Sequence, residues 1–222
     1  MGDTIKLTAP DGHGFDGYRA DPQGTARAGL IVVQEIFGVN SYMREVCDGL
    51  AAEGYMALAP ALFDRADRGV ELGYEADDVA RGREIRGQIS WDDAVLDVEA
   101  AAKELASLAK VGIVGYCWGG SMAWLGACRL GFNCAVGYYG GQIINFVGET
   151  PSCPTMLHFG ETDASIPLAD VEAIRDTHPG VPIHIYAGTG HGFSCDHRGS
   201  YNAEATATAR QRTLAFFADY LG

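Results

Sequence analysis

Short apolar runs alternate with longer amphipathic stretches along most of this chain. Apolar runs bounded by glycine, proline or polar residues are typical of buried strands. They predict strands at 30–34, 55–60, 111–114, 134–139, 155–159 and 183–186. Residues 4–20, broken by Asp11-Gly12 and Asp16-Gly17, predict an N-terminal β-hairpin.

The segments between these strands carry helical periodicity. Between Trp91 and Leu105 the apolar residues are three or four positions apart, as on one face of a helix. Asn40 or Ser41 is expected to cap a helix that ends at Gly54. Further helices are predicted after residue 118, over 77–87 and 171–177, and at the C-terminus. Strands alternating with helices indicate an α/β fold, and we expect one domain over residues 1–222, its mostly parallel sheet covered on both faces.

Composition narrows the class of protein. The 222 residues are 47% hydrophobic and 20% charged, with a formal net charge of −13. This charge argues against binding to nucleic acid or to an anionic membrane, since both require a basic face. The six cysteines form no C-x-x-C pair, and no signal peptide or membrane-length apolar run is visible. We therefore expect reduced thiols, a cytoplasmic location, and a monomer or small homo-oligomer.

The most informative stretch is Gly115-Tyr116-Cys117-Trp118-Gly119, which follows a predicted strand and precedes a predicted helix. The spacing is that of the nucleophile elbow G-x-S-x-G, with cysteine in place of serine. Glycines flank such a turn because the backbones approach closely around a strained apex. The alternative is a buried cysteine in an ordinary glycine-rich turn.

Two further loops at strand ends carry the partners that such a nucleophile needs. Asp163 follows the predicted strand 155–159, and His191 follows 183–186. The order Cys117, Asp163, His191 is that of an α/β-hydrolase triad, although each residue alone could be an ordinary loop residue. Cys117 would attack an acyl carbon, His191 would transfer protons, and Asp163 would orient the imidazole. Trp118 and Ile36 are the expected backbone donors to the oxyanion.

A carboxylate, Glu35, ends the predicted strand 30–34. Its charge would hinder a nearby thiolate, and the alternative is a solvated loop residue. The sequence Cys195-Asp196-His197 lies close to His191, but its spacing does not support a metal site, and none is expected.

Four segments together resemble the dienelactone hydrolase (carboxymethylenebutenolidase) family, in order and over essentially the whole chain. They are Gln34–Gly38, Gly115–Gly120, Gly137–Gly140 and Gly190–Phe193. The resemblance implies a single-domain α/β-hydrolase that needs no cofactor and opens the enol-lactone ring of dienelactone to maleylacetate. By the same resemblance Cys117, Asp163 and His191 match the triad.

The resemblance also implies roles for residues around the triad. Glu35 matches a carboxylate that holds the resting thiol neutral until substrate arrives, and Ile36 and Trp118 match the oxyanion donors. The family places an arginine that grips the substrate carboxylate four residues after the histidine, where this chain has Cys195.

Other residues are therefore expected to bind substrate: Arg198, Arg81 in the charge-rich, lid-like segment 62–89, and Tyr138. The arginines could also be solvated surface residues. We expect a cysteine-dependent hydrolase of a small enol-lactone, acting through a thioester. The alternatives are an esterase or thioesterase for another small acyl group and a non-catalytic redox sensor.

Overall fold

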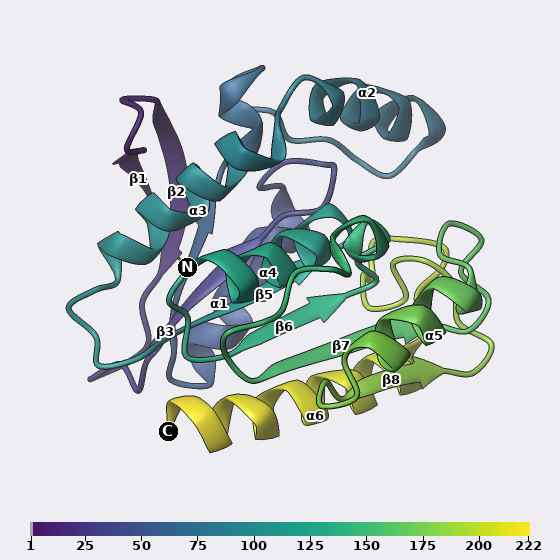
Figure 1. The fold of residues 1–222 in the computed structure, drawn as a ribbon. Helices are drawn as coiled ribbons and strands as arrows, with labels where there is room; N and C mark the ends of the chain where they lie inside the picture. Colours follow the sequence, from purple (N-terminus) through teal and green to yellow (C-terminus); the bar gives the residue numbers. More distant parts are fainter. Residues whose placement is uncertain (1) are drawn as a thin grey trace. The chain divides into compact units, whose positions relative to one another are not determined.

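A computed structural model describes residues 2–222 (Figure 1). The chain forms two compact units, one up to Gly112 and one from Ile113 onward, and the boundary falls inside strand β5, Val111–Tyr116. Each unit has its own strands and helices.

The first unit contains the strands β1 (Asp3–Thr8), β2 (Gly14–Ala20), β3 (Gly29–Val33) and β4 (Met56–Pro60). They are arranged in the order β1-β2-β4-β3. β1 and β4 run antiparallel to β2, whereas β3 and β4 run parallel. The N-terminal hairpin is confirmed.

The predicted break at Asp16-Gly17 is wrong, because both residues lie inside β2. Gly17 pairs with Ile5 of β1 and with Pro60 of β4. A Cβ at this position would press on the side chains of Leu7 and Leu58. The glycine therefore permits close packing within the sheet rather than a turn.

The helices of the first unit are α1 (Ser41–Ala52), α2 (Ala76–Gly87) and α3 (Trp91–Glu104), with a short 3₁₀ turn η1 at Leu62–Arg65. The Asn40 side chain caps α1 by accepting from the Met43 N–H at 3.2 Å. α1 and α3 pack on β3 and β4. The amphipathic pattern that predicted α3 is reflected in its buried residues Val95 and Val98.

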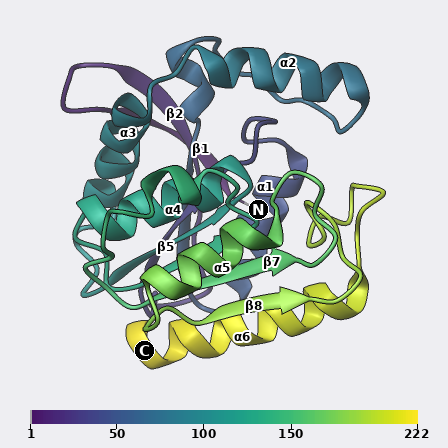
Figure 2. The same ribbon diagram turned by 45° about the vertical axis from the view of Figure 1, so that its right-hand side comes forward.

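The second unit contains β5, β6 (Ala135–Tyr138), β7 (Thr155–Gly160) and β8 (Ile183–Tyr186), which lie in that order and are all parallel. Its helices are α4 (Trp118–Arg129), α5 (Leu168–Thr177) and α6 (Ala203–Leu221), with a 3₁₀ turn η2 at Ile143–Phe146. α4 and α5 cover one face of these strands and α6 the other (Figure 2).

Glycines allow α4 to lie unusually close to β6. A Cβ at Gly120 would overlap the carbonyl oxygen of Tyr138, and one at Gly137 would press on the Gly120 carbonyl. On the opposite face, the Thr213 hydroxyl of α6 lies 2.7 Å from the Tyr138 hydroxyl and 3.1 Å from His158 Nε2. Parallel strands between two helical layers confirm the α/β class. None of the helices described within residues 2–222 is long and apolar enough to cross a membrane.

Candidate active site

Cys117 lies at the strained turn between β5 and α4. Its φ of 56° falls in the left-handed region, which residues other than glycine seldom adopt. The Cys117 N–H donates to the Tyr138 carbonyl at 3.0 Å, and the Cys117 carbonyl accepts from the Gly120 N–H at 3.0 Å. A Cβ at Gly115 would overlap the Gly119 carbonyl. The predicted strained turn is therefore present, and Gly115 has the predicted steric role.

The elbow gives the thiol an environment suited to a nucleophile. Cys117 is the residue that precedes the first turn of α4, and it is partly exposed. The positive end of a helix dipole favours an anion at this position. Trp118 is the first residue of α4, and its backbone N–H lies in this first turn, while its side chain is 1% exposed.

Asp163 and His191 form a close pair. The distance from His191 Nδ1 to Asp163 Oδ2 is 2.7 Å, and the Asp163 side chain is fully buried. The second carboxylate oxygen, Oδ1, accepts from the Ser165 N–H at 2.8 Å. Asp163 is thus fixed at both oxygens, and it holds the Nδ1 side of the imidazole.

The loops that carry this pair are joined by backbone contacts. The N–H and the hydroxyl of Thr162 both donate to the Thr189 carbonyl, each at 2.9 Å. The Gly188 N–H donates to the Glu161 carboxylate at 2.8 Å. These bonds hold the segment after β7 against the segment after β8, so the acid and the histidine are kept in register.

His191 is also hydrogen-bonded to Cys117. Burial of the ring opposes its charged form, but the charge of Cys117 and hydrogen bonds with Asp163 and Cys117 outweigh burial. Together they raise the pKa of His191 to about 10. With Nδ1 occupied by Asp163, Nε2 is left to face the thiol. The three residues thus form one hydrogen-bonded chain, which can pass a proton from sulfur to nitrogen.

The first unit carries the other two residues expected near such a site. Glu35 follows β3 and is 1% exposed. Its carbonyl accepts from the Gln34 side-chain amide at 3.2 Å, and that side chain also accepts from the Leu62 N–H at 3.1 Å. Ile36, the next residue, is partly exposed. A solvated-loop reading of Glu35 is therefore wrong, because the carboxylate is buried.

The predicted lid-like segment packs on this same loop. The Leu72 N–H donates to the Phe37 carbonyl at 2.9 Å, and Gly38 pairs with Glu71. In α2, a Cβ at Gly82 would overlap the Ile36 carbonyl. The segment is thus tied to the loop through backbone contacts at several points.

The residues expected to bind substrate lie in different surroundings. Arg81 is exposed and pairs with Asp67 at 2.6 Å and with Glu84 at 2.8 Å. Arg198 is partly exposed, and its guanidinium lies so close to Gly192 that a Cβ there would meet its Nη1 atom at 2.5 Å. Arg198 therefore crosses the loop immediately after His191.

Tyr138 is 3% exposed, and its hydroxyl lies 2.7 Å from the Thr213 hydroxyl of α6. The neighbouring Tyr139 instead has its ring 5.1 Å from the His191 ring, measured between centroids. Only Tyr138, the first of these tyrosines, is expected from the sequence to bind substrate. Alternation along a strand could have indicated that Tyr138 and Tyr139 have different surroundings, because successive side chains point to opposite faces.

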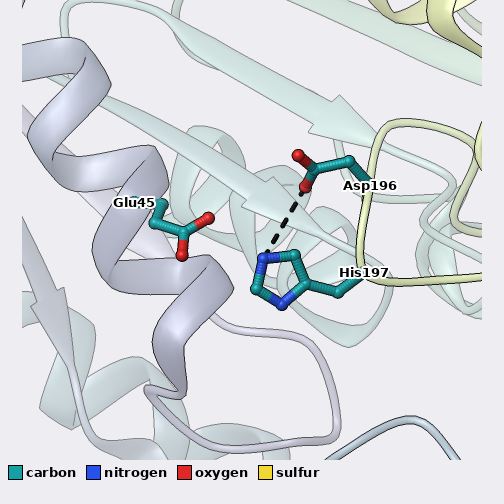
Figure 3. Close-up of side chains that lie close together, drawn as sticks. All are labelled: Glu45, Asp196 and His197. Carbon is teal, nitrogen blue, oxygen red and sulfur yellow. Dashed lines mark ion pairs between the residues drawn. The ribbon is translucent and has the colours of Figure 1, made fainter.

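Asp196 and His197 form an exposed ion pair of 3.8 Å between the Asp196 carboxylate and His197 Nε2 (Figure 3). Figure 3 also draws Glu45, which belongs to α1 of the first unit. An exposed pair of this kind contributes little to stability.

Comparisons with known proteins identify the family of the chain. The model of the dienelactone hydrolase family matches residues 15–221. The chain belongs to this family. A carboxymethylenebutenolidase from Pseudomonas putida is 33% identical over 225 residues, covering 96% of this chain and 95% of its own. A second carboxymethylenebutenolidase, from Pseudomonas sp. strain P51, is 31% identical over 221 residues, covering 95% and 92%.

A solved structure from Klebsiella pneumoniae, named provisionally as a dienelactone hydrolase, matches with a TM-score of 0.87 at 29% identity. It covers 99% of this chain and 100% of its own. These matches confirm the resemblance and the α/β-hydrolase fold expected from it. A dienelactone hydrolase family member is a hydrolase, and this chain is therefore an enzyme of that class.

Proposed function

We propose that the chain hydrolyses a small lactone or ester through a thioester on Cys117. The observation that carries this proposal is the continuous chain of contacts from the buried Asp163, at 2.7 Å from His191 Nδ1, to the Cys117 thiol. Relatives named carboxymethylenebutenolidase point to an enol-lactone of the dienelactone type.

The proposed reaction has two halves. His191 accepts the Sγ proton, and the thiolate attacks the acyl carbon to form a C–S bond. The carbon–oxygen bond of the lactone then breaks, and the leaving oxygen takes the proton from His191. In the second half His191 deprotonates a water molecule, whose oxygen attacks the thioester. The C–S bond breaks and the thiolate regains its proton. Trp118 and Ile36 donate their backbone N–H groups to the oxyanion formed in each half.

Glu35 has a gating role in this proposal. Cys117 favours the charged form of His191, and the Glu35 carboxylate is the negative charge that we propose to keep the resting thiol neutral. We expect the Glu35→Gln variant to be alkylated faster by iodoacetamide at Cys117 in the absence of substrate. An unchanged labelling rate would contradict the gating role of Glu35 without contradicting the hydrolytic proposal.

Arg198 is the residue we propose to grip a substrate carboxylate, since it crosses the loop at Gly192 beside His191. An Arg198→Met variant is expected to raise KM about 10-fold for a carboxylate-bearing lactone. KM of the same variant for an uncharged ester should stay within about twofold of the wild-type value. The control is Arg175→Met in α5, which should change neither KM. Equal changes in KM for both substrates would mean that Arg198 does not bind the carboxylate.

The decisive test of the reaction uses Cys117→Ala and His191→Ala with dienelactone and with a panel of uncharged activated esters. Loss of turnover on all substrates supports the mechanism, and full activity in either variant contradicts it. If wild type turns over the esters but not dienelactone, the chain is an esterase for another acyl group. The Cys195 at the family's arginine position favours this second candidate.

A further inference from the structure

Tyr139 has an unusual backbone for a bulky side chain. Its φ is 38°, and within residues 2–222 the other non-glycine residue with positive φ is the nucleophile Cys117. Strain of this kind persists only where surrounding contacts enforce it. The Tyr139 N–H donates to the His158 carbonyl at 2.7 Å, so the strained backbone is anchored at the end of β6.

The Tyr139 side chain reaches the loop that carries the histidine. The side chain is fully buried, and its hydroxyl lies 2.8 Å from the hydroxyl of Ser194. Ser194 is three residues after His191, in the same loop. The ring also packs edge-on against Phe193, with the centroids 5.6 Å apart. Tyr139 therefore holds the loop at a point beyond the histidine.

The same ring lies against the imidazole itself. The centroids of Tyr139 and His191 are 5.1 Å apart and the planes are inclined by 59°. Asp163 holds the Nδ1 side of the imidazole and Cys117 bonds to the other side, so these two hydrogen bonds leave the ring free to rotate about the line that joins them. The tyrosine ring supplies a further contact, which removes this freedom.

We propose that Tyr139 and Ser194 form a positioning pair, in which their hydrogen bond fixes the loop and the tyrosine ring so that His191 Nε2 faces the Cys117 thiol. This inference rests on the proposed hydrolytic role of the triad. It explains why a tyrosine is held at positive φ: a relaxed backbone would direct the ring elsewhere and leave the imidazole unsupported.

The test removes each hydroxyl separately and then together, with Tyr139→Phe, Ser194→Ala and the double variant. Hydrolysis of p-nitrophenyl acetate gives kcat and KM, and iodoacetamide labelling of Cys117, followed by mass spectrometry, gives an activity-independent readout. A small misplacement of a catalytic group lowers rates by up to about 100-fold, so we expect kcat to fall about 10-fold to about 100-fold with KM within about twofold. Cys117 labelling should slow as well, because a misplaced imidazolium stabilises the thiolate less.

The double variant separates one shared interaction from two independent ones. If both hydroxyls act through the same hydrogen bond, the double variant should be no slower than the slower single variant. Multiplying effects would contradict the proposed pair.

Tyr186→Phe is the matched control. It also removes one buried tyrosine hydroxyl from the second unit, a hydroxyl that lies 2.9 Å from His158 Nδ1. It should lower the thermal midpoint about as much as Tyr139→Phe does, yet leave kcat and Cys117 labelling unchanged. If both variants lose stability and neither changes kcat or labelling, Tyr139 is a packing residue and the inference fails. Cys117→Ala, assayed in parallel, identifies failure of the hydrolytic proposal, because it would then retain turnover.

Discussion

Replacing Asp163 with asparagine changes one group in the hydrogen-bonded chain and leaves its shape intact. The Ser165 N–H, 2.8 Å from Asp163 Oδ1, can bond equally well to an asparagine oxygen. The amide NH₂ then faces His191 Nδ1 in place of the carboxylate oxygen 2.7 Å away. Nδ1 must accept this hydrogen bond, so the proton of the neutral imidazole moves to Nε2. A protonated Nε2 cannot take the proton from Cys117.

The size of the effect follows from two contributions. A hydrogen bond to a charged group contributes roughly 1.5–3 kcal/mol, which corresponds to about 10-fold to about 150-fold in rate. The reversed tautomer adds to this, and the same replacement in a serine-protease triad lowers kcat about 10,000-fold. We therefore expect kcat of Asp163→Asn to lie about 100-fold to about 10,000-fold below wild type.

Steady-state hydrolysis of an activated ester measures this change, with circular dichroism as the check on folding. Asp176→Asn is the control, because Asp176 is an exposed acid of α5 in the same unit and should have wild-type kcat. A folded Asp163→Asn protein with kcat within about threefold of wild type would refute the assignment of Asp163 as the residue that orients His191.

Three further predictions concern packing and titration. Gly115→Ala should abolish esterase activity and lower the free energy of unfolding, measured by urea titration, by about 1–3 kcal/mol, because its Cβ overlaps the Gly119 carbonyl. The control is Gly148→Ala, whose Cβ would lie in open space and should leave the free energy of unfolding unchanged. Gly192→Ala should reduce kcat/KM through its φ of +74° and the Arg198 side chain; an unchanged value would contradict this. Burial holds the pKa of His158 well below 6.5, so the folded state binds fewer protons than the unfolded state. The free energy of unfolding should therefore fall by up to about 1.4 kcal/mol for each pH unit below about pH 6.5. The His158→Gln variant should show a smaller slope.

The elbow could be predicted from sequence because its constraints are local. The close approaches at Gly115 and Gly120 arise within one strand, one turn and the helix that follows, so glycine spacing alone indicates them. The order Cys117, Asp163, His191 added long-range information, because the carboxyl ends of parallel strands meet at one edge of a sheet. Their contacts within the second unit agree with that expectation.

Features that depend on tertiary contacts could not be predicted. A tyrosine at positive φ runs against its intrinsic preference, and it is held there by the His158 carbonyl, by Ser194 and by the packed rings around Tyr139. Asp97 of α3 is a second example, because nothing in the pattern of its helix indicates that it is buried. It is in fact fully buried, with both oxygens 2.8 Å from the Arg65 guanidinium, and burial raises its pKa to about 6 although Arg65 opposes the shift.

Trapping the acyl-enzyme tests the central claim most directly. Wild-type protein is mixed with excess p-nitrophenyl acetate, quenched in acid within the first turnovers and digested. The mass of each cysteine-containing peptide is then measured by mass spectrometry. The mechanism predicts one acetyl group on the Cys117 peptide, together with a burst of one equivalent of nitrophenol per enzyme. Neither should occur in the Cys117→Ala variant. Turnover without an acetylated Cys117, or an acetyl group confined to another residue, would contradict the claim that Cys117 is the nucleophile.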